Sequence, residues 1–259
     1  MIRIGPAGSS GLGNAEGVSE VKRLGLDAME VEFTYGVRMS IATAKQVGEE
    51  AKKSGIKLSI HAPYYINLAS TDKIKQKASQ KRILDSCERG HYFGTEKELT
   101  PIVFHAGFYQ GKDKEEVYGI IKESIIEMQK IIKEKKWNIM LCPETTGKPS
   151  QFGNIDELVR LSKETKCGIT VDFAHLKARQ NGKKEYEQWM EKLKPFKHIH
   201  CHFSGIEWTE KGERRHLITE KKDINELLEW LKKYKMDATI INESPDPIAD
   251  SLKTKELIK

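Results

Sequence analysis

The sequence predicts an α/β fold, a single (β/α)8 TIM barrel, because eight short apolar segments alternate with eight amphipathic helical segments over 259 residues. Such alternation is typical of parallel βαβ units, whose strands are buried on both faces. A closed barrel of eight units takes about 250 residues, which this chain supplies. No Pro- or Ser-rich linker interrupts the pattern, so we expect one domain spanning residues 1–259. A doubly wound open sheet is the alternative architecture.

The strands are predicted where apolar and β-branched residues form short runs between turn residues. In chain order these runs occupy residues 2–5, 28–33, 57–61, 101–105, 138–143, 168–173, 198–203 and 238–242. Helices are predicted where apolar residues recur every three or four positions among Lys and Glu. They occupy residues 15–24, 41–54, 72–93, 114–135, 155–164, 184–193, 224–234 and 248–258. A long polar loop is expected between the seventh strand and the helix that follows it.

The composition indicates a soluble protein and leaves the binding partner open. Hydrophobic residues make up 38% of the chain and charged residues 32%. No apolar run reaches the roughly 18 residues that span a membrane, and the N-terminus lacks a signal-peptide pattern. We therefore expect a cytoplasmic protein with no membrane partner. The formal net charge of +6 is compatible with a nucleic-acid partner, although solubility alone also explains such a balance.

Potential metal ligands stand at the ends of the predicted strands. Residues at the carboxyl ends of barrel strands converge on the face that carries active sites. Six lie at such ends, one lies just past the sixth strand and two lie in the loop after the seventh: His61, His105, Glu144, Asp172, His202 and Glu243, then His175, then Glu213 and His216. Imidazole and carboxylate together suit zinc, manganese or iron. Nine ligands exceed the about four that one zinc takes, so we expect two or three ions, with Glu144 or Glu243 bridging them.

Six segments then occur in order along nearly the whole chain: His61-Ala62-Pro63-Tyr64, Phe104-His105-Ala106-Gly107, Pro143-Glu144-Thr145-Thr146-Gly147, Val171-Asp172-Phe173-Ala174-His175, His202-Phe203-Ser204-Gly205 and Asn242-Glu243-Ser244. Together they resemble the endonuclease IV family of apurinic/apyrimidinic endonucleases. The resemblance implies an eight-stranded α/β barrel with three zinc ions. It also implies hydrolysis of the phosphodiester bond 5′ to an abasic site in duplex DNA, by a metal-bridged hydroxide.

The resemblance also implies how the ligands divide among the ions. His61, His105 and Glu144 are expected at a first zinc. Glu144, Asp172, His202 and Glu243 are expected at a second, so that Glu144 is shared and Glu144 and Glu243 are the expected catalytic carboxylates. His175 is expected at the third. Its partners differ in kind from those of the family, because the family carries an Asp-x-His pair where this chain has Glu213-Arg214-Arg215-His216. Arg214 cannot bind a metal, so Glu213 and His216 are the expected substitutes.

Two further residues match family positions that contact DNA. Arg38 lies in the loop after the second strand, and Tyr64 lies three residues after His61. The resemblance implies that both side chains enter the duplex at the lesion and stabilise the flipped-out nucleotide. The expected protein is thus a monomeric DNA repair enzyme. A metal-dependent sugar isomerase or epimerase on the same barrel is the alternative, and a non-catalytic metal- or nucleic-acid-binding barrel is a third.

Overall fold

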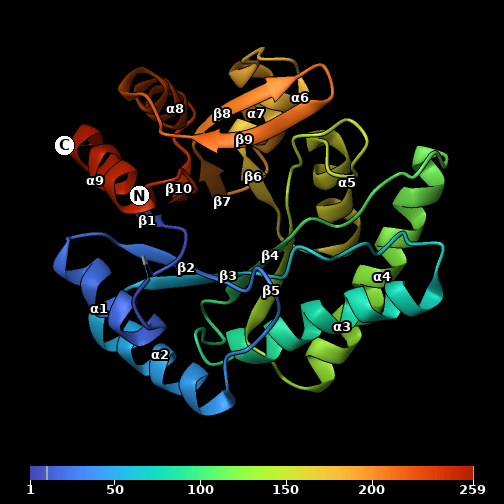
Figure 1. Cartoon of the computed structure of the whole chain (residues 1–259), viewed down its shortest axis with the longest axis horizontal. Coiled ribbons are helices and arrows are strands. Elements are labelled where there is room, and N and C mark those ends of the chain that lie inside the picture. The colour runs from blue at the N-terminus through green and yellow to red at the C-terminus, as the bar shows by residue number, and fades with distance from the viewer. Residues whose placement is uncertain (10, 259) are drawn as a thin grey trace.

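A ring of parallel strands forms the centre of the computed structural model, which describes residues 1–9 and 11–258 (Figure 1). Two four-stranded parallel sheets make up the ring in these residues. The first has the order β1 (Ile2–Pro6), β10 (Asp237–Asn242), β7 (His198–Phe203), β6 (Thr170–Asp172). The second has the order β2 (Ala28–Glu32), β3 (Lys57–His61), β4 (Thr100–Phe104), β5 (Ile139–Pro143). Parallel bridges from Ala7 to Glu30 and from Glu144 to Thr170 join the sheets. The predicted eight-stranded barrel is therefore confirmed.

Helices surround this ring, and Figure 1 shows both termini on the same side, beside β1 and α9. The helices are α1 (Asn14–Arg23), α2 (Ile41–Ser54), α3 (Lys73–Gly90), α4 (Lys114–Glu134), α5 (Ile155–Thr165), α6 (Phe173–Arg179), α7 (Tyr186–Leu193), α8 (Lys221–Lys233) and α9 (Pro247–Ile258). Local chemistry sets their starts. Asp72 accepts hydrogen bonds from the first turn of α3, and Asn154 forms a reciprocal capping box with Glu157 at α5. Most helices begin within two residues of their predicted starts.

Two elements differ from the prediction, and both adjoin the metal-ligand residues. Helix α6 follows β6 directly, where no helix was predicted. The predicted loop after β7 is wrong in part, because it contains an antiparallel hairpin of β8 (Gly205–Thr209) and β9 (Gly212–Leu217). The hairpin is mostly polar because only one of its faces is covered. Ile206 of β8 packs with Ala174 and Ala178 of α6, and this small cluster seats the hairpin on the helix.

One glycine is required where the ring closes between β1 and β2. A Cβ atom on Gly5 would lie 1.7 Å from the backbone oxygen of Ala28. No side chain fits that spacing, so only glycine allows the two strands to approach here. Within the described residues, no helix combines the length and the apolar character needed to cross a membrane.

Candidate metal centre

The nine predicted ligands lie together at the carboxyl ends of the barrel strands. Eight of them form three groups in which the ligand atoms all lie within 4.8 Å of one another: His61, His105 and Glu144; Glu144, Asp172, His202 and Glu243; and Asp172, His175 and His216. Glu213 adjoins the third group, with its Oε2 atom 3.4 Å from Nε2 of His175. The proximity that metal binding requires is thus present for all nine, and their role as ligands stays a prediction.

Glu144 stands at the centre of the site. Its side chain follows β5 and is buried, with 1% of the residue exposed. Oε2 lies 3.2 Å from Nε2 of His61 and 3.0 Å from Nε2 of His105. Oε1 lies 3.1 Å from Nδ1 of His202 and 3.4 Å from Nδ1 of His175. Each carboxylate oxygen therefore faces a different pair of imidazoles, which is the arrangement expected of a bridging ligand.

The junction of β6 and α6 positions Asp172 and His175. Asp172 ends the strand and caps the helix, because its Oδ1 accepts a hydrogen bond of 2.7 Å from the backbone N–H of His175. The other oxygen, Oδ2, is buried and accepts no hydrogen bond, and it lies 3.2 Å from Nδ1 of His175. Nε2 of His175 is buried and likewise makes no hydrogen bond. A buried carboxylate oxygen and a buried imidazole nitrogen that make no hydrogen bond fit a bound cation.

The β8–β9 hairpin supplies the remaining two residues. His216 lies near His175, with ring centroids 5.3 Å apart, and its Nδ1 is 2.7 Å from the Ser204 hydroxyl. Glu213 packs against Gly147, where an added Cβ would lie 2.5 Å from the Cβ of Glu213. A glycine at position 147 therefore makes room for this carboxylate beside His175. The hairpin, rather than a flexible loop, sets the distance of both residues from the barrel.

Interactions between neighbouring charged groups determine the pKa values in the site when no metal is bound. Burial opposes protonation of His61, yet Glu144, Glu32 and Glu30 raise its pKa to about 10. Burial also opposes ionisation of Glu243, but the charge of His202 lowers its pKa to about 2. The metal-free centre therefore pairs imidazolium groups with carboxylates. Divalent cations would replace those protons on the imidazoles, so binding would release protons.

Sequence reasoning missed two carboxylates of β2. Glu30 is fully buried, with Oε1 2.9 Å from Nε2 of His202 and Oε2 3.0 Å from Nε2 of His200. The Ser59 hydroxyl donates a 2.6 Å hydrogen bond to the same Oε2. Glu32 lies two residues further along, and burial raises its pKa to about 8. The sequence spacing could have indicated them. Residues two apart in a strand share one face, so two glutamates in an apolar strand are expected to point into the barrel together.

An open cavity of about 450 Å³ leads to the ligands. Tyr64 lines it, is 57% exposed and meets His61 edge to face. Lys148 and Phe108 also line it. Arg38 does not: its exposed side chain lines a neighbouring hollow of about 460 Å³. The two hollows share Glu32 and Thr34, so Arg38 lies beside the metal-ligand residues but does not contact them.

Comparison with known proteins identifies the family. Residues 18–259 match the family described as the xylose isomerase-like TIM barrel. The chain belongs to this family. The uncharacterized protein MJ0133 of Methanocaldococcus jannaschii is 36% identical over 240 residues, which cover 88% of this chain and 85% of that protein. A protein of Ureaplasma urealyticum serovar 10 named "Probable endonuclease 4" is 26% identical over 125 residues, which cover 46% of this chain and 39% of that protein.

Solved structures of xylose isomerase-like barrels share the fold at low identity. SacUVDE superposes with a TM-score of 0.74 and 15% identity, covering 95% of this chain and 84% of that one. A D-tagatose 3-epimerase-like protein superposes with a TM-score of 0.72 and 20% identity, covering 99% and 95%. These likenesses establish the barrel. Because the similar proteins include one named as a probable endonuclease and one named as epimerase-like, the choice between these chemistries rests on the site.

The hairpin ligands of this xylose isomerase-like barrel can be tested by metal content. We expect His216→Ala to bind one ion fewer per chain than the wild type, because it removes one of the two imidazoles of the third group and leaves fewer than the about four ligands that zinc takes. Glu213→Gln should weaken binding of the same ion by a smaller factor, since Glu213 adjoins the third group only through His175. Elemental analysis of both variants checks this. His91→Ala, a histidine outside the site, is the matched control, and an unchanged ion count in His216→Ala would contradict the assignment.

Proposed function

We propose that this protein is a metal-dependent DNA repair endonuclease that hydrolyses the phosphodiester bond 5′ to abasic sites. The observation that carries the proposal is the presence of three adjoining ligand groups, two of them sharing Glu144 and two sharing Asp172. One four-ligand group would suffice for a single ion. Three groups suit several ions side by side, which is how phosphodiester hydrolysis is commonly catalysed. The partial similarity to a protein named as an endonuclease supports the same choice.

The predicted ligands are distributed among three ions in this proposal. His61, His105 and Glu144 would hold one ion, Glu144, Asp172, His202 and Glu243 a second, and Asp172, His175, His216 and Glu213 a third, with zinc the expected metal and manganese or iron the alternatives. Bound ions would supply Lewis acidity toward the phosphate and lower the pKa of the attacking water. Burial of Glu144 and Asp172 keeps bulk water away from these ligands.

The rim of the cavity has the side chains that a distorted duplex requires. Tyr64 and Phe108 are exposed aromatic rings beside the ligands, at 57% and 39% exposure. Such rings stack against bases or fill the gap left by a flipped nucleotide. Lys148 at the rim and Arg38 in the adjoining hollow add positive charge for the phosphates. We propose that duplex DNA lies across this face, with the abasic nucleotide in the cavity.

A nicking assay tests the proposal. The metal-loaded protein is incubated with a labelled duplex that carries one abasic analogue, and the product length reports the cleaved bond. We expect a single nick on the 5′ side of the analogue, no nick in the undamaged duplex, and loss of cleavage with a chelator. A fully metallated protein, verified by elemental analysis, that leaves the duplex intact would refute the endonuclease.

Glu32 favours one alternative specifically. Its carboxyl group lines the same cavity, and burial raises its pKa to about 8, near the range that suits proton transfer to or from a sugar carbon. A metal-dependent ketose epimerase on this barrel is therefore the second candidate. Turnover of ketoses, with no nicking by the same preparation, would establish it in place of the endonuclease.

A further inference from the structure

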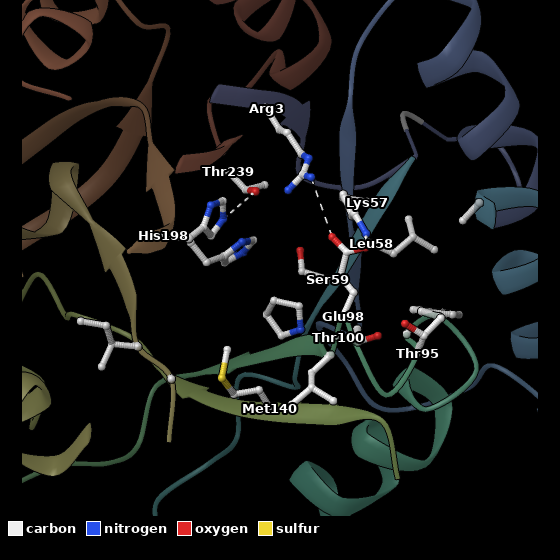
Figure 2. Close-up of a pocket in the computed structure, with 18 of the residues that line it drawn as sticks. Arg3, Lys57, Leu58, Ser59, Thr95, Glu98, Thr100, Met140, His198 and Thr239 are labelled. Atoms are coloured by element: carbon white, nitrogen blue, oxygen red, sulfur yellow. Dashed lines mark hydrogen bonds and ion pairs between the residues drawn. The ribbon is translucent and has the colours of Figure 1, made fainter. Parts of the chain in front are cut away.

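The barrel has a second large cavity at the end opposite the metal centre. Its volume is about 840 Å³, and residues from the amino ends of β1, β3, β4, β7 and β10 line it. Figure 2 shows the labelled side chains of Arg3, Lys57, Glu98, His198 and Thr239 around an open space between the strands. Barrel interiors are normally filled by layers of side chains. A hollow of this size at the amino-terminal mouth, lined by charged groups, is the size of a small-molecule site.

Positive charge exceeds negative charge in this mouth. Arg3 and Lys57, from β1 and β3, both contact the carboxylate of Glu98, with Nη2 of Arg3 3.8 Å from Oε1. Their side chains are 30% and 32% exposed, so water screens them only in part. Lys52 and Lys197 also line the cavity. Among the described residues that line the cavity, Glu98 is the one acidic side chain. Arg3 and Lys57 therefore share one carboxylate.

Neutral polar groups complete one wall. Nε2 of His198 lies 3.0 Å from the Thr239 hydroxyl, an interaction drawn in Figure 2. Partial burial, followed by the charges of His200 and Arg3, lowers the pKa of His198 to about 4. The imidazole is therefore neutral at pH 7 and adds a hydrogen-bonding group without adding charge. This wall can orient a polar head group that the two cations attract.

Apolar side chains also line the cavity. They are Leu58, Phe93, Met140, Ile169 and Phe196. A cavity lined by both cations and aliphatic and aromatic side chains does not suit a small inorganic anion, which would leave the apolar side chains in contact with water. It suits a molecule with an anionic head and an apolar body.

We propose that the amino-terminal mouth of the barrel binds an amphipathic organic anion, whose head group contacts Arg3 and Lys57 and whose body packs on the apolar side chains that line the cavity. Glu98 competes with that head group for the same two cations. The site is separate from the metal centre, which lies at the other end of the strands. The inference therefore stands or falls independently of the nuclease activity.

Binding of anilinonaphthalene sulfonate tests the proposal, because this fluorescent probe has a sulfonate head on an apolar body. We expect the Arg3→Gln/Lys57→Gln double variant to bind it about tenfold or more weakly, since one or two charge-assisted contacts are lost. Glu98→Gln should bind it more tightly than the wild type, because the competing carboxylate is gone. Phenylnaphthylamine, which lacks the sulfonate, should bind the double variant and the wild type alike. Inorganic phosphate alone should compete poorly.

Opposite shifts in probe affinity, weaker in the Arg3→Gln/Lys57→Gln variant and tighter in Glu98→Gln, distinguish a binding site from a folding defect. Far-UV circular dichroism and thermal unfolding verify that both variants are folded, and Glu98→Gln remains informative if the double variant is not. Glu144→Gln, at the metal centre, should bind the probe as the wild type does. An unchanged affinity in the folded double variant, weaker binding in Glu98→Gln, or loss of probe binding in Glu144→Gln would each overturn the proposal.

Discussion

Glu144→Gln is expected to retain at most one metal ion per chain and to lose at least about 100-fold in nicking rate, more than mutation of an outer-shell partner usually costs. The reason is the position of this carboxylate in two of the three groups that the predicted ligands form. The amide keeps the size of the side chain but replaces one oxygen with an N–H donor, which cannot bind a cation. The third group, with Asp172, His175 and His216, does not include Glu144 and should keep its ion.

Elemental analysis of the purified variant measures this directly. Glu243→Gln is the graded comparison, because Glu243 belongs to one group only and its loss should remove one ion. Glu229→Gln, an exposed glutamate of α8, controls for the substitution itself and should keep the full complement. If Glu144→Gln binds as many ions as the wild type, Glu144 is not the shared ligand, and the division of the site into bridged groups is wrong.

The barrel and most of the site could be predicted because both depend on local sequence. Eight apolar runs determine eight strands, and parallel strands bring their carboxyl ends to one face. His61, His105 and Glu144 end three neighbouring strands, so their proximity follows from topology once the strand ends are known. Asp172 was expected from the end of the sixth strand in the same way, whereas the cap that places His175 belongs to α6, a helix that was not predicted.

The hairpin and the β2 glutamates could not be placed in the same way. The β8–β9 segment packs on α6 through Ile206 and exposes its other face, so most of its residues are polar. Its sequence therefore lacks the apolar run by which the other strands were predicted. Glu213 approaches His175 only because Gly147 leaves space for it, a tertiary contact that spacing does not reveal. The spacing of Glu30 and Glu32 indicates that both point into the barrel, but it does not show which residues they face. The importance of Glu30 depends on His202 facing it across the barrel, which required the three-dimensional structure.

Glu30→Gln is expected to weaken metal binding about 10- to 100-fold without removing a ligand. Glu30 lies 2.9 Å from Nε2 of His202, while Nδ1 of the same ring lies 3.1 Å from both Glu144 and Glu243. A buried carboxylate at Nε2 stabilises a proton there and leaves the Nδ1 lone pair for a cation. Glu30 is thus a positioning residue that acts through His202. In Glu30→Gln the neutral amide fills the same space but no longer favours the His202 tautomer that carries its proton on Nε2.

Two measurements separate this role from simple destabilisation. Chelator competition gives the metal dissociation constant, and nitrogen NMR of the His202 ring reports which nitrogen carries the proton. Ser59→Ala is the matched control, because Ser59 donates to Oε2 of Glu30 and does not belong to a ligand group. Both variants should lose about 1–3 kcal/mol of stability, the cost of an unpaired buried polar group. Only Glu30→Gln should shift the His202 tautomer and the metal affinity, so equal effects in both variants would show that Glu30 only supports the core.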